Sequence, residues 1–339
     1  MPRQEFRLKA GPIDMHAHIV PPAFLKAIET TGRPGFSLAR DKEGGRRLTL
    51  GGKPMQNPIM AAMDSMEIRQ KTMEEQGVAA QIVSPWIALI PNPLEEEDAG
   101  WLASLFNDSL AETVAEHPDI LLGIGSVPLR FPERAARMLR RMVETQGLIG
   151  AEINTTLGPD RFLDDPALDP FWAEAEGLGA LIMIHPSLGG SGKQYESYYL
   201  NNLIHNPVET AVAGAHLIFG GVLERFPALR ICLVHGGGML PYDIGRLRRG
   251  HKMRKETQVA MKGSVDDSYN RFLFDTVTHS VSALRFLVQE VGAQRVFLGS
   301  DYPFDMADPD PVATVRAATF PAVDEEAILS GNLGRLFSG

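Results

Sequence analysis

The amino-acid sequence predicts an α/β fold, a (β/α)₈ TIM barrel with a small insertion after the first strand. Short apolar runs rich in β-branched residues alternate with longer amphipathic segments along the chain, about eight times. Such alternation is typical of parallel sheets, and about eight repeats favour a closed barrel over an open doubly wound sheet. The chain has 339 residues, a length that such barrels reach as one domain, so we expect one domain over residues 1–339. The pattern alone does not exclude an open sheet.

The predicted strands are apolar almost throughout, which indicates parallel strands buried on both faces. They lie at Pro12–Met15, Ala80–Ser84, Leu121–Val127, Ile149–Ile153, Leu181–Ile184, Ile231–Val234, Phe272–Asp275 and Val296–Gly299. In a barrel of this kind the carboxyl ends of all the strands open on one mouth, where active sites are built.

The segments between these strands carry helical signals. Glu95–Glu116 places Leu102, Leu110 and other apolar residues on one stripe, which is helical periodicity. Pro132 suits a first helical turn, and Gly147 suits the end of the same helix. Helices are predicted at Ile59–Gln76, Glu95–Glu116, Pro132–Thr145, Val208–Arg225 and Val281–Val291.

Residues 33–58 interrupt the alternation. The segment is rich in Gly, Pro and charged residues and contains Gly44-Gly45 and Gly51-Gly52, which favour turns. Because it follows the first strand, we interpret it as a small hairpin near the barrel mouth. A mobile surface loop explains the same composition equally well.

The composition is that of an ordinary globular protein, with 44% hydrophobic and 22% charged residues. A formal charge of −9 argues against a nucleic-acid partner, because general nucleic-acid binders carry a basic face. The one dense basic stretch, Arg246–Lys255, is either a solvated helix face or a source of cations for an anionic substrate.

The cellular location can also be predicted. The single cysteine, Cys232, cannot supply a disulfide framework and fits a reducing compartment. No uncharged apolar run approaches the ~20 residues that span a bilayer. The N-terminus lacks the apolar core of a signal peptide. We therefore expect a cytoplasmic location and no membrane partner.

Four candidate metal ligands stand where predicted strands end. His16 and His18 close the first strand, where alternation points both imidazoles to one side. His185 and Asp301 follow later strands, and the ends of barrel strands converge, so the four side chains can meet around one ion. Imidazole and carboxylate suit Zn²⁺ and related divalent metals. A lone strand-end histidine is more often structural, so the prediction depends on the four together.

His235 also ends a predicted strand and is followed by Gly236, Gly237 and Gly238. The glycines allow a sharp turn that leaves the imidazole open to a ligand. Imidazole suits proton transfer near neutral pH, so we predict His235 as the general acid/base, with a structural role as the alternative. Asp301 is expected to take part in catalysis beside it.

At these positions the sequence resembles the amidohydrolase superfamily, specifically the subgroup around 2-amino-3-carboxymuconate-6-semialdehyde decarboxylase. The resemblance covers nearly the whole chain. Its most specific motifs are HGGGMLPYDIGR at His235–Arg246 and LGSDYPF at Leu298–Phe304. Four shorter motifs support them: DMHAH at Asp14–His18, IHP at Ile184–Pro186, GGVLERFP at Gly220–Pro227 and FDTVTH at Phe274–His279.

The resemblance implies one divalent ion, zinc first and manganese as the alternative, with His235 activating the water on that metal. The implied ligands are His16, His18, His185 and Asp301. Arg246 would bind the carboxylate of a small substrate and could reach across a homodimer interface into the neighbouring site.

The resemblance also implies further substrate contacts. The insertion should supply a second carboxylate-binding arginine, for which Arg46 and Arg47 are the candidates, and we expect Arg47 to take this role. Phe304 of the last motif is expected to contact the substrate. The family typically has an aromatic residue after the His-Pro pair, whereas this chain has Ser187 at the start of a Gly-rich loop.

The leading functional hypothesis is non-oxidative decarboxylation of a small unsaturated or aromatic carboxylic acid. The metal would orient the acid, and His235 would return a proton to the carbon that loses CO₂. The same groups could serve a hydrolase or hydratase acting on a lactone, amide, C–C bond or double bond. A binding protein that has lost catalysis is the non-enzymatic alternative, and the complete set of site residues argues against it.

Overall fold

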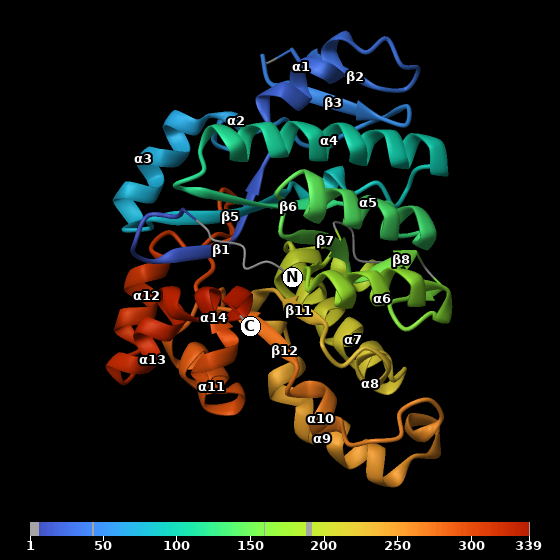
Figure 1. Ribbon diagram of the computed structural model, residues 1–339, viewed down its shortest axis with the longest axis vertical. Coiled ribbons are helices and arrows are strands. Elements are labelled where there is room, and N and C mark those ends of the chain that lie inside the picture. The colour runs from blue at the N-terminus through green and yellow to red at the C-terminus, as the bar shows by residue number, and fades with distance from the viewer. Residues whose placement is uncertain (1–6, 43, 159, 188–191, 339) are drawn as a thin grey trace.

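Eight parallel strands form a barrel in the computed structural model, which describes residues 7–42, 44–158, 160–187 and 192–338 (Figure 1). The strands follow chain order around the barrel, and the last returns to the first through bonds from the Met15 amide to the Leu298 carbonyl and from the Asp301 amide to the His16 carbonyl. The strands are β1 (Ile13–Ile19), β5 (Ala80–Pro85), β6 (Leu121–Ser126), β7 (Gly150–Asn154), β10 (Leu181–His185), β11 (Arg230–Leu233), β12 (Phe272–Asp275) and β13 (Val296–Phe297). The predicted (β/α)₈ barrel is confirmed.

The barrel strands are buried on both faces, as their apolar sequences predicted. In β10, Leu181 and Met183 point into the barrel and contact an interior cluster that includes Cys232. The alternate residues, Ile182 and Ile184, belong to the larger cluster between the strands and the surrounding helices. This two-sided burial is the reason that the strands appear in the sequence as continuous apolar runs.

Helices cover the outside of the barrel. Two have the predicted bounds, α5 (Pro132–Thr145) and α11 (Val281–Val291), and α4 (Glu96–Glu116) begins one residue later than predicted. Further helices are α1 (Pro22–Thr30), α6 (Asp169–Leu178), α9 (Leu240–Met253), α10 (Val265–Tyr269), α12 (Pro311–Ala317), α13 (Ala322–Glu326) and α14 (Asn332–Ser338). None of the described helices combines the length and apolar character needed to cross a membrane.

Two segments predicted as single helices are broken. The first divides into α2 (Ala61–Asp64) and α3 (Met66–Gln76), because Ser65 is extended and its hydroxyl accepts a hydrogen bond from the Ile68 amide as an N-cap. The second divides into α7 (Asn206–Phe219) and α8 (Val222–Arg225), because Gly221 takes a left-handed conformation with φ of 68°. Local capping chemistry therefore overrides the continuous helical pattern.

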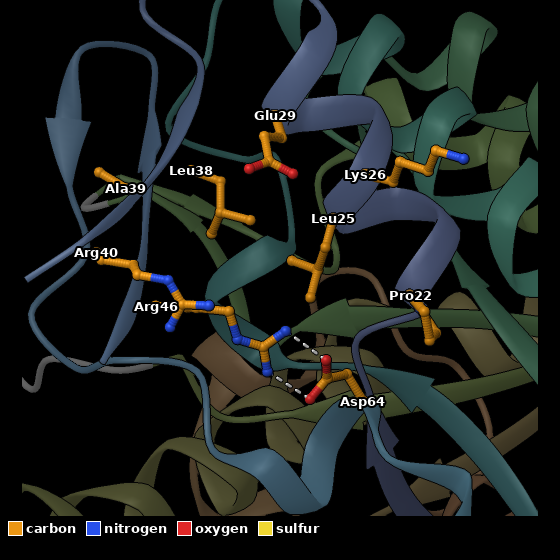
Figure 2. A pocket seen from close by; sticks show the side chains of 9 residues that line it. All are labelled: Pro22, Leu25, Lys26, Glu29, Leu38, Ala39, Arg40, Arg46 and Asp64. Carbon is orange, nitrogen blue, oxygen red and sulfur yellow. Dashed lines mark hydrogen bonds and ion pairs between the residues drawn. The ribbon is translucent and has the colours of Figure 1, made fainter. Parts of the chain in front are cut away.

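The insertion forms a three-stranded antiparallel sheet of β2 (Ser37–Arg40), β3 (Arg46–Leu50) and β4 (Lys53–Pro54), which contacts α1. Leu48 anchors this sheet, because its side chain is fully buried. Arg46 pairs with Asp64 through two hydrogen bonds of 2.6 and 2.7 Å. A cavity of about 440 Å³ lies here, and Figure 2 shows the Arg46–Asp64 pair on one side of it and α1 on the other. The assignment of residues 1–339 to one domain stays a prediction.

Candidate metal centre and active site

His16 and His18 lie inside β1 rather than after it. The strand continues to Ile19 instead of ending at Met15, because its last residues pair with β5 and bridge to Tyr302. The pairing register shifts next to His16, as it does at a β-bulge, which re-aims side chains at barrel rims. Both imidazoles are fully buried and lie edge to face, with ring centroids 5.1 Å apart.

Hydrogen bonds fix the orientation of three imidazoles. His16 Nδ1 lies 2.7 Å from Asp275 Oδ2. His18 Nδ1 lies 2.9 Å from the Pro85 carbonyl oxygen, and His185 Nδ1 lies 2.9 Å from the Pro186 carbonyl oxygen. Carbonyl and carboxylate oxygens only accept, so each Nδ1 carries the hydrogen and donates it. In the neutral imidazole each Nε2 then keeps its lone pair, which is the form in which imidazole binds a metal.

The three Nε2 atoms converge on Asp301. Asp301 Oδ1 lies 3.1 Å from His18 Nε2, 3.3 Å from His16 Nε2 and 3.9 Å from His185 Nε2. The Nε2 atoms of His16 and His18 are only 3.1 Å apart, and His185 Nε2 is buried with no hydrogen-bond partner among the described residues. Nitrogen lone pairs and a carboxylate held this close fit a divalent ion. The four predicted ligands therefore come together.

The charges of this cluster also favour a cation. Burial lowers the pKa of His16, but the carboxylates of Asp301, Asp275 and Glu152 outweigh burial and raise this pKa to about 9. Burial likewise raises the pKa of Asp301, but its imidazole neighbours hold that pKa well below the usual range. Burial lowers the pKa of His185 to about 3, which keeps this imidazole neutral. A positive charge thus sits among buried carboxylates, where a metal ion can replace it.

His235 lies on the other side of Asp301. Its Nε2 is 3.3 Å from Asp301 Oδ2, whereas Asp301 Oδ1 faces the three histidines described above. His16, His185, His235 and Asp301 each offer one ligand atom within 4.8 Å of the others. His235 and Asp301 both have left-handed backbones, with φ of 55° and 65°, which aim their side chains from tight turns. The carboxylate of Asp301 therefore links the histidine cluster to His235.

A buried polar network contacts the backbone of β1 and the side chain of Asp14 on the same strand. The guanidinium of Arg69, which is 1% exposed, donates to the His18 carbonyl at 2.6 Å and to Gln81 Oε1 at 2.8 Å. Gln81 in turn donates to Asp14 Oδ2, which also accepts the Ser300 hydroxyl at 2.6 Å. The backbone amides of His16 and Ser300 both donate to Asp14 Oδ1 at 3.0 Å, so β1 and the loop that carries Asp301 are tied to the same buried carboxylate.

A pocket of about 450 Å³ opens next to the cluster and includes His235 and Asp301. Its walls come from the turn that follows β11, the loop after β12, α9, α11, and the segment that leads into the first turn of α7. The apolar lining consists of Leu203, Pro207, Pro241, Tyr242, Val277, Ala283, Phe286, Leu287 and Met306, and the polar lining adds Asn202, Asn206, Thr278 and His279. No arginine or lysine belongs to this lining among the described residues. This mainly apolar lining with a few polar groups suits a small ligand that has an apolar body and polar substituents.

The structure also locates Phe304 and the two candidate arginines of the insertion. Phe304 is partly buried, and its ring centroid lies 4.9 Å from that of His18. Arg46 and Arg47 are both engaged within the chain: Arg46 pairs with Asp64, and Arg47 donates to the Met55 and Gln56 carbonyls and to Asp41.

Arg246 is exposed on α9 and makes no hydrogen bond or ion pair within the described part of the chain. Neither Arg246 nor Arg47 lines the 450 Å³ pocket. Of the Gly-rich loop that begins at Ser187, residues 188–191 lie outside those that the structure describes.

Asp275 is a site residue that the sequence analysis did not select. It is the last residue of β12, it is fully buried, and it accepts hydrogen bonds from both His16 and the His235 backbone. Burial raises its pKa, but His16, His235 and the Gly236 amide together outweigh burial and hold the pKa below its usual range. Asp275 stands at the end of a predicted strand, as the candidate histidines do. This position is the feature of the sequence that could have identified it as a site residue.

The comparison with known proteins agrees with this geometry. The amidohydrolase family model matches residues 13–338. A 2-amino-3-carboxymuconate-6-semialdehyde decarboxylase of Dictyostelium discoideum is 32% identical over 323 residues, which cover 94% of this chain and 89% of that protein. A gamma-resorcylate decarboxylase of Rhodococcus jostii is 31% identical over 261 residues, which cover 72% of this chain and 78% of that protein.

Solved structures share the whole architecture. The 2,6-dihydroxybenzoate decarboxylase from Rhizobium superposes with a TM-score of 0.79 at 26% identity, covering 97% of this chain and 99% of that one. A dihydroxybenzoic acid decarboxylase from Polaromonas, solved with bound manganese and 2-nitroresorcinol, has a TM-score of 0.79 at 25% identity, with 97% of each chain covered. With a family model that spans nearly its full length, the chain belongs to the amidohydrolase family.

Proposed function

We propose that this protein is a metal-dependent, non-oxidative decarboxylase of a small aromatic or unsaturated carboxylic acid. The observation that carries the proposal is the convergence of three imidazole Nε2 atoms on Asp301 Oδ1, with His235 on Asp301 Oδ2 beside a pocket. Several relatives that resemble the chain over most of its length carry the name of decarboxylases, which supports this reaction among those that the site could perform.

We propose that one divalent ion is held by His16, His18, His185 and Asp301. The donor set of three nitrogens and a carboxylate suits zinc and also manganese, and manganese is bound in the Polaromonas relative. When bound, the metal supplies positive charge that stabilises the negative charge developing on the substrate as CO₂ leaves. We retain zinc as the first candidate because imidazole ligands dominate the site.

His235 is proposed to deliver the proton that completes the reaction. The bond between the ring carbon and the carboxylate breaks, the electron pair stays on that carbon, and the His235 Nε2 hydrogen fills the vacated position. Asp301 Oδ2, at 3.3 Å, orients the imidazole and stabilises its protonated form. The apolar wall formed by Tyr242 and Phe286 lies beside this step, and the buried side chains of Val277 and Leu287 limit the access of water.

The substrate is proposed to be a small carboxylate with a planar apolar body. The ring would lie against the apolar wall, and Asn202, Asn206 and His279 offer partners for hydroxyl or carbonyl substituents. We retain Phe304 and Arg47 as proposed substrate contacts, of which Phe304 is closer to the cluster through its contact with His18.

A homodimer is part of the proposal because the described pocket lining has no arginine or lysine. Arg246 is exposed on α9, without a partner among the described residues, and Tyr242, one turn earlier, lines the pocket while 79% exposed. A second copy packed on this face would bury Tyr242 and could bring its Arg246 to the substrate carboxylate. The cytoplasmic location stays a prediction from the sequence.

Arg246→Lys is expected to raise KM for a carboxylate substrate roughly tenfold and to leave kcat nearly unchanged. Lysine keeps the charge but cannot form the forked pair of hydrogen bonds to a carboxylate. Steady-state kinetics measure both constants, and Arg140→Lys is the matched control, because Arg140 forms an exposed pair with Glu174 on another helix. An unchanged KM would return Arg246 to the role of a solvated helix residue.

The proposed reaction is tested by product analysis on metal-loaded protein. We expect CO₂ release from hydroxylated benzoic acids, loss of this activity after chelation, and recovery when zinc or manganese is added back. Ring-opened products from lactones without CO₂ release would favour the hydrolase alternative. Failure to bind any divalent metal after chelation and re-addition would favour a binding protein without catalysis.

A further inference from the structure

Asp275 joins the two halves of the site through four short hydrogen bonds. Its Oδ2 accepts from His16 Nδ1 at 2.7 Å and from the His235 amide at 2.9 Å. Its Oδ1 accepts from the Gly236 amide at 2.7 Å and from the Val277 amide at 3.1 Å. The side chain is fully buried at the end of β12. One carboxylate therefore contacts a proposed metal ligand and the backbone of the proposed acid/base.

The backbone held by Asp275 is an unusual turn. His235, Gly236 and Gly237 are consecutive residues with φ of 55°, 60° and 77°. A positive φ is unfavourable for a residue with a side chain, so this conformation of His235 depends on the contacts around it.

The turn also packs tightly against β12 and the loop that follows it. A Cβ at Gly236 would approach Thr278 Cγ2 to 2.9 Å, and a Cβ at Gly237 would lie 2.7 Å from the Phe274 ring. The two amide bonds to Asp275 thus fix a turn that has little room to shift.

We propose that Asp275 is a positioning residue that sets the metal ligand and the proton donor together. By accepting the Nδ1 hydrogen, it keeps the Nε2 lone pair of His16 available to the metal. By holding the two amides, it keeps the His235 imidazole 3.3 Å from Asp301 Oδ2. The inference rests on the proposed function, since it assumes that His16 binds metal and that His235 transfers a proton.

Asparagine cannot reproduce these contacts, because all four partners of Asp275 are donors. If the new amide nitrogen faces His16, the imidazole must take the other tautomer, which places a hydrogen on Nε2 and blocks the metal. If it faces Gly236 and Val277, one backbone amide of the turn and one of the loop after β12 lose their acceptor. Either orientation disturbs one half of the site directly and strains the other.

The test measures metal affinity and metal-saturated turnover separately. For Asp275→Asn we expect the dissociation constant for zinc, from chelator competition, to rise about 10–100-fold, as is typical when the support of a ligand is removed. We expect kcat at saturating zinc to remain at least tenfold below that of the unchanged protein. Adding His235→Asn to this variant should reduce kcat by a smaller factor than it does alone, because Asp275 acts through His235.

The control is a second Asp–His pair in the same chain. Asp164 Oδ1 accepts from His216 Nδ1 at 2.9 Å, away from the pocket, so Asp164→Asn should change neither zinc affinity nor kcat. If Asp275→Asn does not fold, Asp275→Glu keeps the charge with a displaced carboxylate, and the same two measurements apply.

The outcomes separate this inference from the proposed function. Unchanged zinc affinity, full recovery of kcat at saturating zinc, or a strictly multiplicative effect with His235→Asn would each overturn the coupling role of Asp275. These results would leave the proposed function intact, provided that the unchanged protein binds zinc and releases CO₂. If the unchanged protein does neither, the proposed function fails first.

Discussion

Asp301→Asn is expected to remove the metal and the activity together. Asp301 Oδ1 lies within 3.9 Å of the Nε2 atoms of His16, His18 and His185, so all three face this negatively charged group. An amide removes that charge and can present a donor nitrogen to a cation. Because loss of a supporting residue already weakens metal binding about 10–100-fold, loss of a direct ligand should cost at least as much.

The measurement is elemental analysis after dialysis, combined with assays of CO₂ release. Asp308→Asn is the matched control, since Asp308 is a buried aspartate a few residues further along the same loop. Its Oδ1 accepts the Asp310 amide, a bond that asparagine can also make. We expect this control to keep both metal and activity. Full metal occupancy in Asp301→Asn would remove Asp301 from the set of ligands.

Much of the barrel could be predicted from the sequence because its strands are buried on both faces. Such strands are apolar at consecutive positions, as β10 (Leu181–His185) illustrates, and long amphipathic helices such as α5 (Pro132–Thr145) separate them. The predicted strand boundaries were wrong where contacts with residues distant in sequence determine the end of a strand. β1 extends to Ile19 because β5 and Tyr302 provide partners beyond the apolar run. These partners are distant in sequence and leave no local signal.

The helix breaks and the insertion have a similar explanation. The hydroxyl of Ser65 caps α3, and the left-handed Gly221 ends the turn before α8, although the apolar pattern continues through both positions. Residues 33–58 are too polar and too rich in glycine to show a clear strand period. The sheet that they form depends on buried Leu48 and on contact with α1, which the composition does not reveal.

For the candidate site too, the sequence predicts which residues come together but does not predict their geometry. The convergence of His16, His18, His185 and Asp301 follows from their places near strand ends, which topology brings to one mouth. The distances among them depend on the register shift in β1 next to His16 and on the left-handed turn at Asp301.

Asp275 was missed because aspartate ends many strands without a functional role. Its proposed role follows from four hydrogen-bond donors, which only the folded chain brings together. They are His16 Nδ1 and the backbone amides of His235, Gly236 and Val277. The apolar wall of the pocket was missed because Tyr242 and Phe286 lie on separate helices.

His235→Asn is expected to keep the metal and to lose about 10²–10⁴-fold in turnover, the usual contribution of a positioned acid/base. The metal should remain, because three other nitrogens and Asp301 Oδ1 still converge on one point without it. Asparagine can donate a hydrogen bond toward Asp301 Oδ2 but cannot transfer a proton near neutral pH. His235 is also only partly buried and faces the pocket, where a substrate carbon can approach it.

This prediction is checked by the metal content and the metal-saturated kcat of the same preparation. His216→Asn is the control, because His216 pairs with Asp164 and stacks on Phe162 outside the pocket. If His235→Asn loses the metal as well, His235 acts as a fifth ligand, as its place among the four groups within 4.8 Å would allow. If turnover stays near normal, another group must supply the proton, and His279, which lines the same pocket, becomes the next residue to substitute.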